Sequence, residues 1–266
     1  MRRKASLAAA IGVALGVSTG AWAADYCPDR PGLDTPPCTV DAGHLAVEAS
    51  LASWTHSADD VSITDQVLIG DLAFRYGLGP TTEARVAWTP YGSVRTKDKL
   101  TGLVTTQHGS GDLTLGIKQN VLDPSGEHLS IALLPRVTLN TGGDALGAGT
   151  WSAGLQIPMA LPMGHGVTVM LTPEFDAAAN ADASGRHFAY GSAGGFGIAA
   201  SNRVNISVEA SVIRDEDPAG ASTTALAGAS ASFKINANLY ADIGGDLGLN
   251  ANSPKHQIYL GIAKRF

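Results

Sequence analysis

The chain has 266 residues, and its 18 Lys and Arg against 24 Asp and Glu give a formal net charge of −6. Only 16% of the residues are charged, where about 25% is usual, and there is no basic stripe, which excludes the footprint of a nucleic-acid-binding protein. An apolar fraction of 44% with so little charge also excludes a disordered chain.

Residues 1–23 have the three parts of a secretory signal peptide. Residues 2–4 are basic, residues 7–17 are apolar, and residues 21–23 form a cleavage site of the A-x-A type. We expect cleavage after Ala23 and export of the remaining chain.

The next segment, residues 24–42, is rich in proline and holds the only two cysteines, Cys27 and Cys38. Export brings them into an oxidising compartment, so we expect a disulfide, which contributes roughly 3 kcal/mol in the chain-entropy model. Two cysteines without a nearby histidine make a poor metal site. We expect a periplasmic segment that either hangs below the domain that follows or folds into it as a plug.

From residue 43 to residue 266 the sequence alternates between apolar and polar side chains with the period of a β-strand. No apolar run here approaches 18 residues, as a membrane-spanning helix would require. Many alternating segments are 10–14 residues long, whereas a tilted strand needs about 9–11 residues to cross a bilayer. The expected strands are 44–56, 63–78, 83–91, 111–121, 128–140, 150–161, 167–176, 187–200, 203–214, 223–235, 238–249 and 256–266.

Twelve is an even number, as bacterial outer-membrane barrels require, and the connections alternate between short ones and longer ones such as 92–110 and 177–186. If the N-terminus is periplasmic, the alternating apolar positions of the strands carry two belts of aromatic residues, one near each membrane interface. A soluble β-sandwich would bury its aromatics in mid-strand. We therefore predict an all-β fold, a transmembrane antiparallel up-and-down barrel of twelve strands. The belts are Trp88, Trp151, Phe175, Phe188 and Tyr190 at the outer ends, and Phe74, Tyr76, Phe196, Phe233 and Phe266 at the inner ends.

The chain stops at an aromatic residue, Phe266, five positions after Gly261. This spacing resembles the sorting signal of outer-membrane proteins, which the barrel-assembly machinery reads. Lys264 stands where an apolar residue is usual, although a lysine near the interface can extend its ammonium group into water. We expect Phe266→Ala to impair assembly.

The polar positions that alternate with the apolar ones face the lumen and carry charges of both signs. On the lipid face such charges would be costly. One interpretation is a network of ion pairs that stiffens the wall, and another is a constriction that sorts solutes by charge. Asp71, Arg75, Glu83 and Arg85 lie on adjacent expected strands and form the expected network. The candidate lumen residues are Glu48, Asp71, Arg75, Glu83, Arg85, Asp112, Lys118, Arg136, Glu174, Asp176, Glu209, Lys234, Asp242, Asp246 and Arg265.

Enzyme signatures are absent from the sequence, which has no G-x-S-x-G, Walker A or H-E-x-x-H motif. No pair of the seven histidines has the spacing of a metal site. His187 with Asp176, or His56 with Asp59 and Asp60, could meet at the rim as a hydrolase site, but chance positions in surface loops explain them better. We expect no enzyme activity, no cofactor and no metal.

Recognisable motifs occupy residues 27–33, 36–40, 82–86, 111–118 and 139–142, together with Pro135. They resemble a family of Gram-negative outer-membrane proteins described as putative transporters of the meta-pathway of phenol degradation. The family more often has proline where Asn140 stands. The resemblance implies an outer-membrane channel or uptake protein, and it supplies no binding residues to transfer to this chain.

Together these features predict an outer-membrane channel that passes small solutes, aromatic or acidic compounds among them, passively through a charged lumen. The alternative is a closed barrel with a structural or adhesive role, and the two differ in whether the lumen is blocked. Expected partners are outer-membrane lipid, lipopolysaccharide, the assembly machinery and a small-molecule solute. The acidic loops 57–60 and 215–217 would contact the cations that bridge lipopolysaccharide molecules. No nucleic acid is expected, and the sequence does not predict an oligomeric state.

Overall fold

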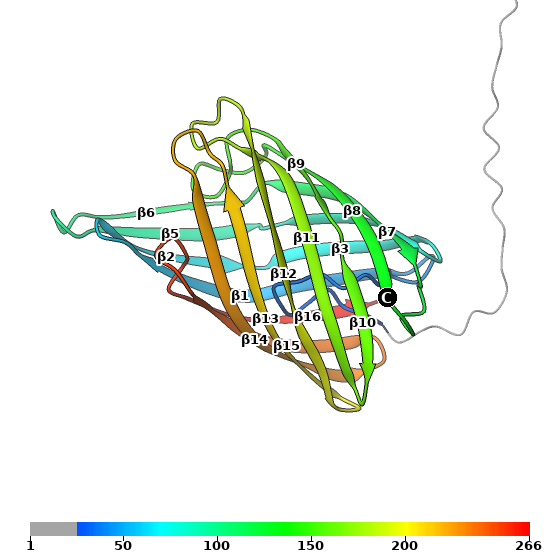
Figure 1. Ribbon diagram of the computed structural model, residues 1–266. Coiled ribbons are helices and arrows are strands. Elements are labelled where there is room, and N and C mark those ends of the chain that lie inside the picture. The colour runs from blue at the N-terminus through cyan, green and yellow to red at the C-terminus, as the bar shows by residue number, and fades with distance from the viewer. Residues whose placement is uncertain (1–25) are drawn as a thin grey trace, which may run out of the picture.

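The computed structural model describes residues 26–266, so the expected signal peptide lies outside the described residues. All regular structure in this part is β, in one antiparallel sheet that closes on itself where β16 pairs with β1. Figure 1 shows the strands wrapped around a central axis. The strands are β1 (Leu45–Ala58), β2 (Ser62–Ile69), β3 (Asp71–Gly79), β4 (Thr82–Trp88), β5 (Tyr91–Asp98), β6 (Val104–Gly109), β7 (Leu113–Leu122), β8 (Ser130–Leu139), β9 (Ser152–Gln156), β10 (Met159–Gly164), β11 (Val167–Ala179), β12 (Arg186–Ser201), β13 (Val204–Asp215), β14 (Ser222–Asn236), β15 (Leu239–Gly248) and β16 (His256–Arg265).

Four of the barrel strands are interrupted, so β2–β3, β4–β5, β6–β7 and β9–β10 each form one strand of the wall. The barrel therefore has twelve strands, which confirms the predicted fold class. Within residues 26–266, no helix has the length and apolar character needed to cross a membrane.

The interruptions in neighbouring strands lie side by side and bend the wall along one line. Gly70 has a positive φ of 69° and its N–H donates to the carbonyl of Ser50 at 2.9 Å, beside a bulge in β1. Pro90 separates β4 from β5, because proline has no N–H to donate to the strand ladder. The Gly111 N–H donates to the carbonyl of Thr89 at 2.8 Å and carries the bend into the next strand.

The expected connection 92–110 is wrong. Residues 91–98 and 104–109 form the strands β5 and β6, which project from the barrel as a hairpin (Figure 1). Its turn is closed by Asp98, whose carboxylate accepts the N–H of Leu100 at 2.9 Å and of Thr101 at 2.7 Å. The alternation rule missed this hairpin because a strand beyond the bilayer needs no apolar face.

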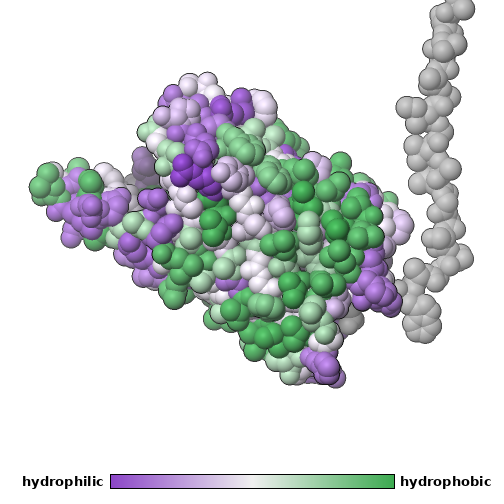
Figure 2. All heavy atoms as spheres, viewed as in Figure 1, coloured by the Kyte–Doolittle hydropathy of each residue, from purple (hydrophilic) through white to green (hydrophobic). Residues whose placement is uncertain are grey.

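The packing is the reverse of that in a soluble protein. The largest side chains that are fully buried include Arg75, Lys118, Glu48 and Glu83, while large apolar side chains cover the outside. Figure 2 shows a band of hydrophobic residues across the barrel, with hydrophilic ones gathered toward the ends. All ten aromatic residues expected in the two belts are exposed, which suits contact with lipid.

Candidate functional site

An N-terminal segment, residues 26–42, precedes β1 and contacts the inward face of the barrel wall. It contains the disulfide between Cys27 and Cys38, as the sequence predicts. Four of its residues are proline, which supply no backbone N–H and prevent regular strand pairing. Figure 1 shows the segment in dark blue, surrounded by strands.

Side chains of the wall accept hydrogen bonds from several backbone N–H groups of the segment. Each acceptor belongs to a different strand, so the segment crosses the interior and does not follow one side of it. The bonds run from Asp29 N–H to Glu48 of β1 at 3.0 Å, from Val40 N–H to Glu83 of β4 at 2.8 Å, from Thr35 N–H to Thr172 of β11 at 3.1 Å, and from Leu33 N–H to Glu209 of β13.

The guanidinium of Arg75 in β3 is completely buried and joins the wall to the segment. It donates twice to Glu83, with both distances 2.9 Å, and once to Glu48 at 2.7 Å. Its remaining hydrogens reach the carbonyl oxygens of Cys27 at 3.0 Å and Cys38 at 3.3 Å. The disulfide holds those two carbonyls together, so one arginine binds both ends of the closed loop.

Lys118 and Arg85 complete a basic cluster with Arg75, and Asp29 of the segment lies among the three. The Lys118 ammonium is 2.7 Å from Asp29 Oδ1, and Arg85 forms an ion pair with the other oxygen. Burial raises the pKa of Asp29, but the three cations lower it by more, so its pKa lies below the usual range and the carboxylate stays charged.

The segment thereby balances the charge of this part of the wall. The wall supplies three cations but only two carboxylates, those of Glu48 and Glu83, and Asp29 supplies the third negative charge. An unpaired charge buried here would cost several kcal/mol by order of magnitude. Electrostatics therefore favours the docked position of the segment.

The other side of the interior is acidic. Arg30 of the segment donates to both oxygens of Asp242 in β15, at 2.9 Å and 3.2 Å. Gly261 of the neighbouring strand β16 leaves room for this arginine, since a Cβ there would lie 2.5 Å from its guanidinium. Nearby Asp246 and Glu209 are both buried.

Asp34 of the segment lies against Glu209 and carries a proton at neutral pH. Burial first, and then the negative charge and hydrogen bonding of Glu209 and the charge of Asp29, raise the pKa of Asp34 to about 8. A released Asp34 would return to a pKa of about 4. Docking therefore takes up a proton between these two pH values.

We predict that Asp34 makes docking of the segment weaken as the pH rises from about 4 to about 8, whereas the lowered pKa of Asp29 weakens docking only in more acidic solution. The raised pKa gives the sign, because the docked state is the one that binds the extra proton. Cleavage of the segment by added protease, measured against pH, should accelerate across this window in the native chain and stay flat in Asp34→Asn. An identical pH profile in Asp34→Asn would refute the assignment.

All fifteen lumen candidates are buried or half-buried. Of the expected network, the structure brings Arg75, Glu83 and Arg85 together, whereas Asp71 instead accepts a hydrogen bond from Thr89 at 2.8 Å. The sequence did not single out Asp29, because the proline-rich segment has no alternating pattern.

The remaining candidates join into smaller groups. Arg136 in β8 contacts Glu174 at 3.3 Å and Asp176 at 2.8 Å in β11. Arg265 forms an ion pair with Asp41 at the end of the segment. Lys234 lies in β14 and is paired in register with Tyr240 of β15.

Asp112 anchors a loop. It lies just before β7, where its carboxylate accepts the N–H of Thr141 at 2.9 Å, of Gly142 at 2.6 Å and of Ala148 at 2.8 Å. This arrangement holds the connection 140–151 against the wall.

We predict that Asp112→Ala loosens the connection 140–151 without unfolding the barrel, because three backbone donors lose one shared acceptor. Limited proteolysis should cut this connection faster in the variant, while the temperature of unfolding changes little. Asp112→Asn keeps one acceptor oxygen and should lie between the two. Equal cleavage rates in all three proteins would show that the anchor has no effect.

Neither histidine–aspartate combination considered for a hydrolase forms. His56 lies 2.8 Å from Asp65, not beside Asp59 or Asp60. His187 lies 2.8 Å from Asp215, and Asp176 is instead paired with Arg136 at 2.8 Å.

The sequence matches the family model described as "Putative MetA-pathway of phenol degradation" over residues 28–266. No curated protein matches the chain. Among solved structures, the COG4313 outer membrane channel from Pseudomonas putida F1 is similar at 15% identity and a TM-score of 0.67, covering 86% of this chain and 97% of that one. The translocator domain of the autotransporter NalP from Neisseria meningitidis is similar at 14% identity and a TM-score of 0.56, covering 85% and 89%. These likenesses concern the fold, which is that of a bacterial outer-membrane barrel.

Proposed function

Because the chain belongs to the family described by the phenol-degradation model, we propose that it is an outer-membrane channel for small aromatic or acidic solutes. The observation that carries this proposal is that the twelve-stranded wall does not fill its own interior. Eight strands give a barrel that side chains fill, and 16–18 give an aqueous channel. Here a separate segment, residues 26–42, occupies space that the wall leaves.

The basic cluster of Arg75, Arg85 and Lys118 suits an anionic solute. When the segment moves aside, Asp29 leaves with it and the wall keeps one excess positive charge at this level. A small carboxylate or phenolate would take the place of Asp29, since a buried cation favours any anion that can reach it. Transport would be passive, because no residue of this site couples to an energy source.

The family and one similar structure support this solute class and role. The family is described by a pathway that degrades phenol, and the Pseudomonas putida protein is described as an outer membrane channel. The first description is that of the family, and the second is that of a similar structure; both support the proposed channel role.

A closed structural barrel is the second candidate, and the complete charge balance around Asp29 favours it. The two differ in conductance. Single-channel recording in planar bilayers, with and without a reductant for Cys27–Cys38, should give discrete steps if the protein is a channel. Silence in both states from protein shown to be folded would support the closed barrel.

The solute class is tested separately in protein-containing liposomes. Influx of benzoate should exceed that of a neutral sugar of similar size, and the excess should fall when Lys118 is replaced by methionine. Equal influx of the two solutes would leave a channel without the proposed preference. Protein-free liposomes are the control for membrane leakage.

We also propose that Phe266 serves as the assembly signal. Its N–H donates to the carbonyl of Leu45 at 2.7 Å, and its ring is exposed. The Lys264 ammonium lies 4.3 Å from the ring centroid, which accounts for a lysine at this position through a cation–π contact. We likewise propose that the acidic loops 57–60 and 215–217 contact the bridging cations of lipopolysaccharide.

A further inference from the structure

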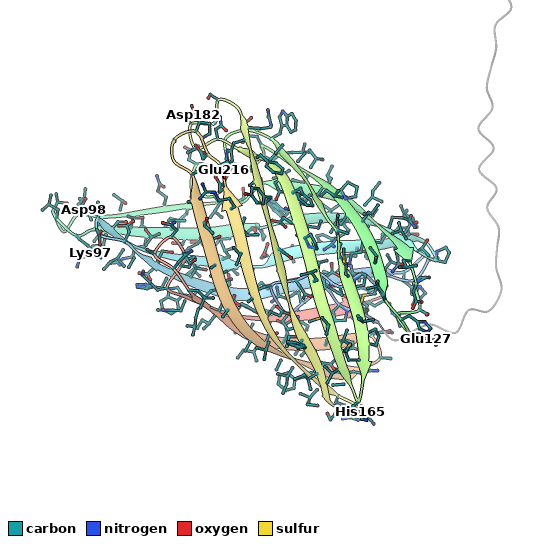
Figure 3. The ribbon with its side chains drawn as sticks, viewed as in Figure 1. Lys97, Asp98, Glu127, His165, Asp182 and Glu216 are labelled. Atoms are coloured by element: carbon teal, nitrogen blue, oxygen red, sulfur yellow. A yellow bond between two sulfur atoms is a disulfide. The ribbon has the colours of Figure 1, made fainter. Side chains whose placement is uncertain are left out.

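His187 lies where β12 begins, at the end of the barrel that carries the longer loops. Figure 3 labels Asp182 and Glu216 in two of these loops, and Glu127 and His165 at the opposite end. The His187 side chain is only 5% exposed. Its Nδ1 lies 3.0 Å from Oδ1 of Asn180, and its Nε2 lies 2.8 Å from Oδ1 of Asp215.

Two aspartates from the next strand and loop face this imidazole. Asp215 ends β13, and Asp217 follows it with a carboxylate oxygen 3.6 Å from Nδ1 of His187. One potential ligand atom from each of the three residues lies within 4.8 Å of the other two. The group was not visible in the sequence, because its members come from two strands and a loop.

The backbone fixes both carboxylates before any ligand arrives. Asp217 accepts the N–H of Ala181 and the N–H of Ala219, both at 2.7 Å. Asp215 accepts the N–H of Asp217 at 3.0 Å. The cluster therefore connects the loop 180–185 with the loop 216–221.

In the neutral His187 imidazole, the contact with Asn180 leaves a buried lone pair on Nε2 without a hydrogen-bond partner. Asn180 Oδ1 is an acceptor, so Nδ1 carries the hydrogen and Nε2 carries the lone pair. Among the residues of the structure, Nε2 is buried without a hydrogen bond of acceptable geometry, although the Asp215 oxygen is close. A cation in contact with both Nε2 and the Asp215 carboxylate, either a proton or a metal ion, would satisfy this buried nitrogen.

We propose that His187, Asp215 and Asp217 bind one divalent transition-metal ion of the zinc class at the loop end of the barrel. Imidazole nitrogen with carboxylate oxygens is a donor set that Zn²⁺ accepts, whereas Ca²⁺ and Mg²⁺ prefer oxygen alone. A ligating histidine usually donates its other ring N–H to an oxygen, and Asn180 is placed to accept that bond. The bound ion joins two neighbouring loops, 180–185 and 216–221, at this end of the barrel.

The test is calorimetric titration of the full folded protein in detergent with Zn²⁺, after treatment with chelator and without a polyhistidine tag. We expect one ion per chain. Loss of an outer-shell partner already costs roughly 10–100-fold in affinity, so His187→Gln and Asp215→Asn should each weaken binding at least that much. Asp215→Asn keeps an oxygen that can accept the Asp217 N–H, so its fold is preserved.

His128→Gln is the matched control, because His128 also lies beside an aspartate, 3.4 Å from Asp123, but is 85% exposed and belongs to no three-residue group in the described chain. Its affinity should equal that of the native protein. Co²⁺ supplies a second readout, since ligation by His187 should give visible absorption bands that the two site variants lose. Absence of saturable Zn²⁺ binding, or binding unchanged in both site variants, would overturn the proposal.

Discussion

Deletion of residues 26–40 is expected to raise the single-channel conductance severalfold. The segment occupies the interior through bonds to side chains of β1, β4, β11 and β13, and no strand of the wall would be lost with it. The deletion removes Asp29 and Arg30 together, so it uncovers the basic cluster and the acidic side with Asp242 alike, and we expect little change in the share of current that anions carry. Conductance and reversal potential in planar bilayers measure both effects.

A point variant tests the same idea with the chain intact. Gly32 has a φ of 129°, and a Cβ there would lie 2.6 Å from the Glu209 carboxylate, so Gly32→Val cannot dock without displacement. We expect frequent transient openings in this variant. Gly79→Ala is the control, since a Cβ at that position meets nothing within 4 Å. Native conductance in both the deletion and Gly32→Val would show that the segment does not restrict the pore.

The wall was predictable because its physics is local. Alternation of side chains follows from the pleat of a strand, and a lipid-facing position must be apolar wherever it lies in the chain. The same rule fails for β5 and β6, which project beyond the barrel and need no apolar face. Gly70 and Pro158 interrupt the expected strands 63–78 and 150–161, which the pattern alone draws as continuous.

The interior was only partly predictable, because its contacts join residues far apart in the chain. Arg75, Glu83 and Arg85 could be grouped since their strands are neighbours in sequence. Asp29 could not be added to this group, because the three cations and two carboxylates that it joins come together only in the folded barrel. The His187 group is invisible for a related reason, since Asp215 comes next to it only through the pairing of β12 with β13.

Arg75→Met is expected to destabilise the folded barrel by about 3–5 kcal/mol, the usual cost of removing one partner from a buried ion pair. The methionine replaces the apolar stem of the arginine but not its charge, so Glu48 and Glu83 are left buried without the cation that both contact. The two carbonyls of the disulfide loop also lose their donor, so the segment should dock more weakly. The midpoint of denaturant unfolding in detergent, followed by heat-modifiable gel migration, measures the effect.

Adding Glu83→Gln to Arg75→Met should recover part of the lost stability, because it removes a carboxylate charge that has lost its arginine. A gain of stability in the double variant would separate an electrostatic cause from simple loss of packing. Arg214→Met is the matched control, since Arg214 is paired with Glu216 at 2.7 Å but both side chains are exposed, and surface pairs of this kind contribute little. An Arg75→Met protein as stable as the native one would mean that desolvation of the cluster cancels its attraction. In that case the docked segment would be retained for closure of the lumen and not for stability of the wall.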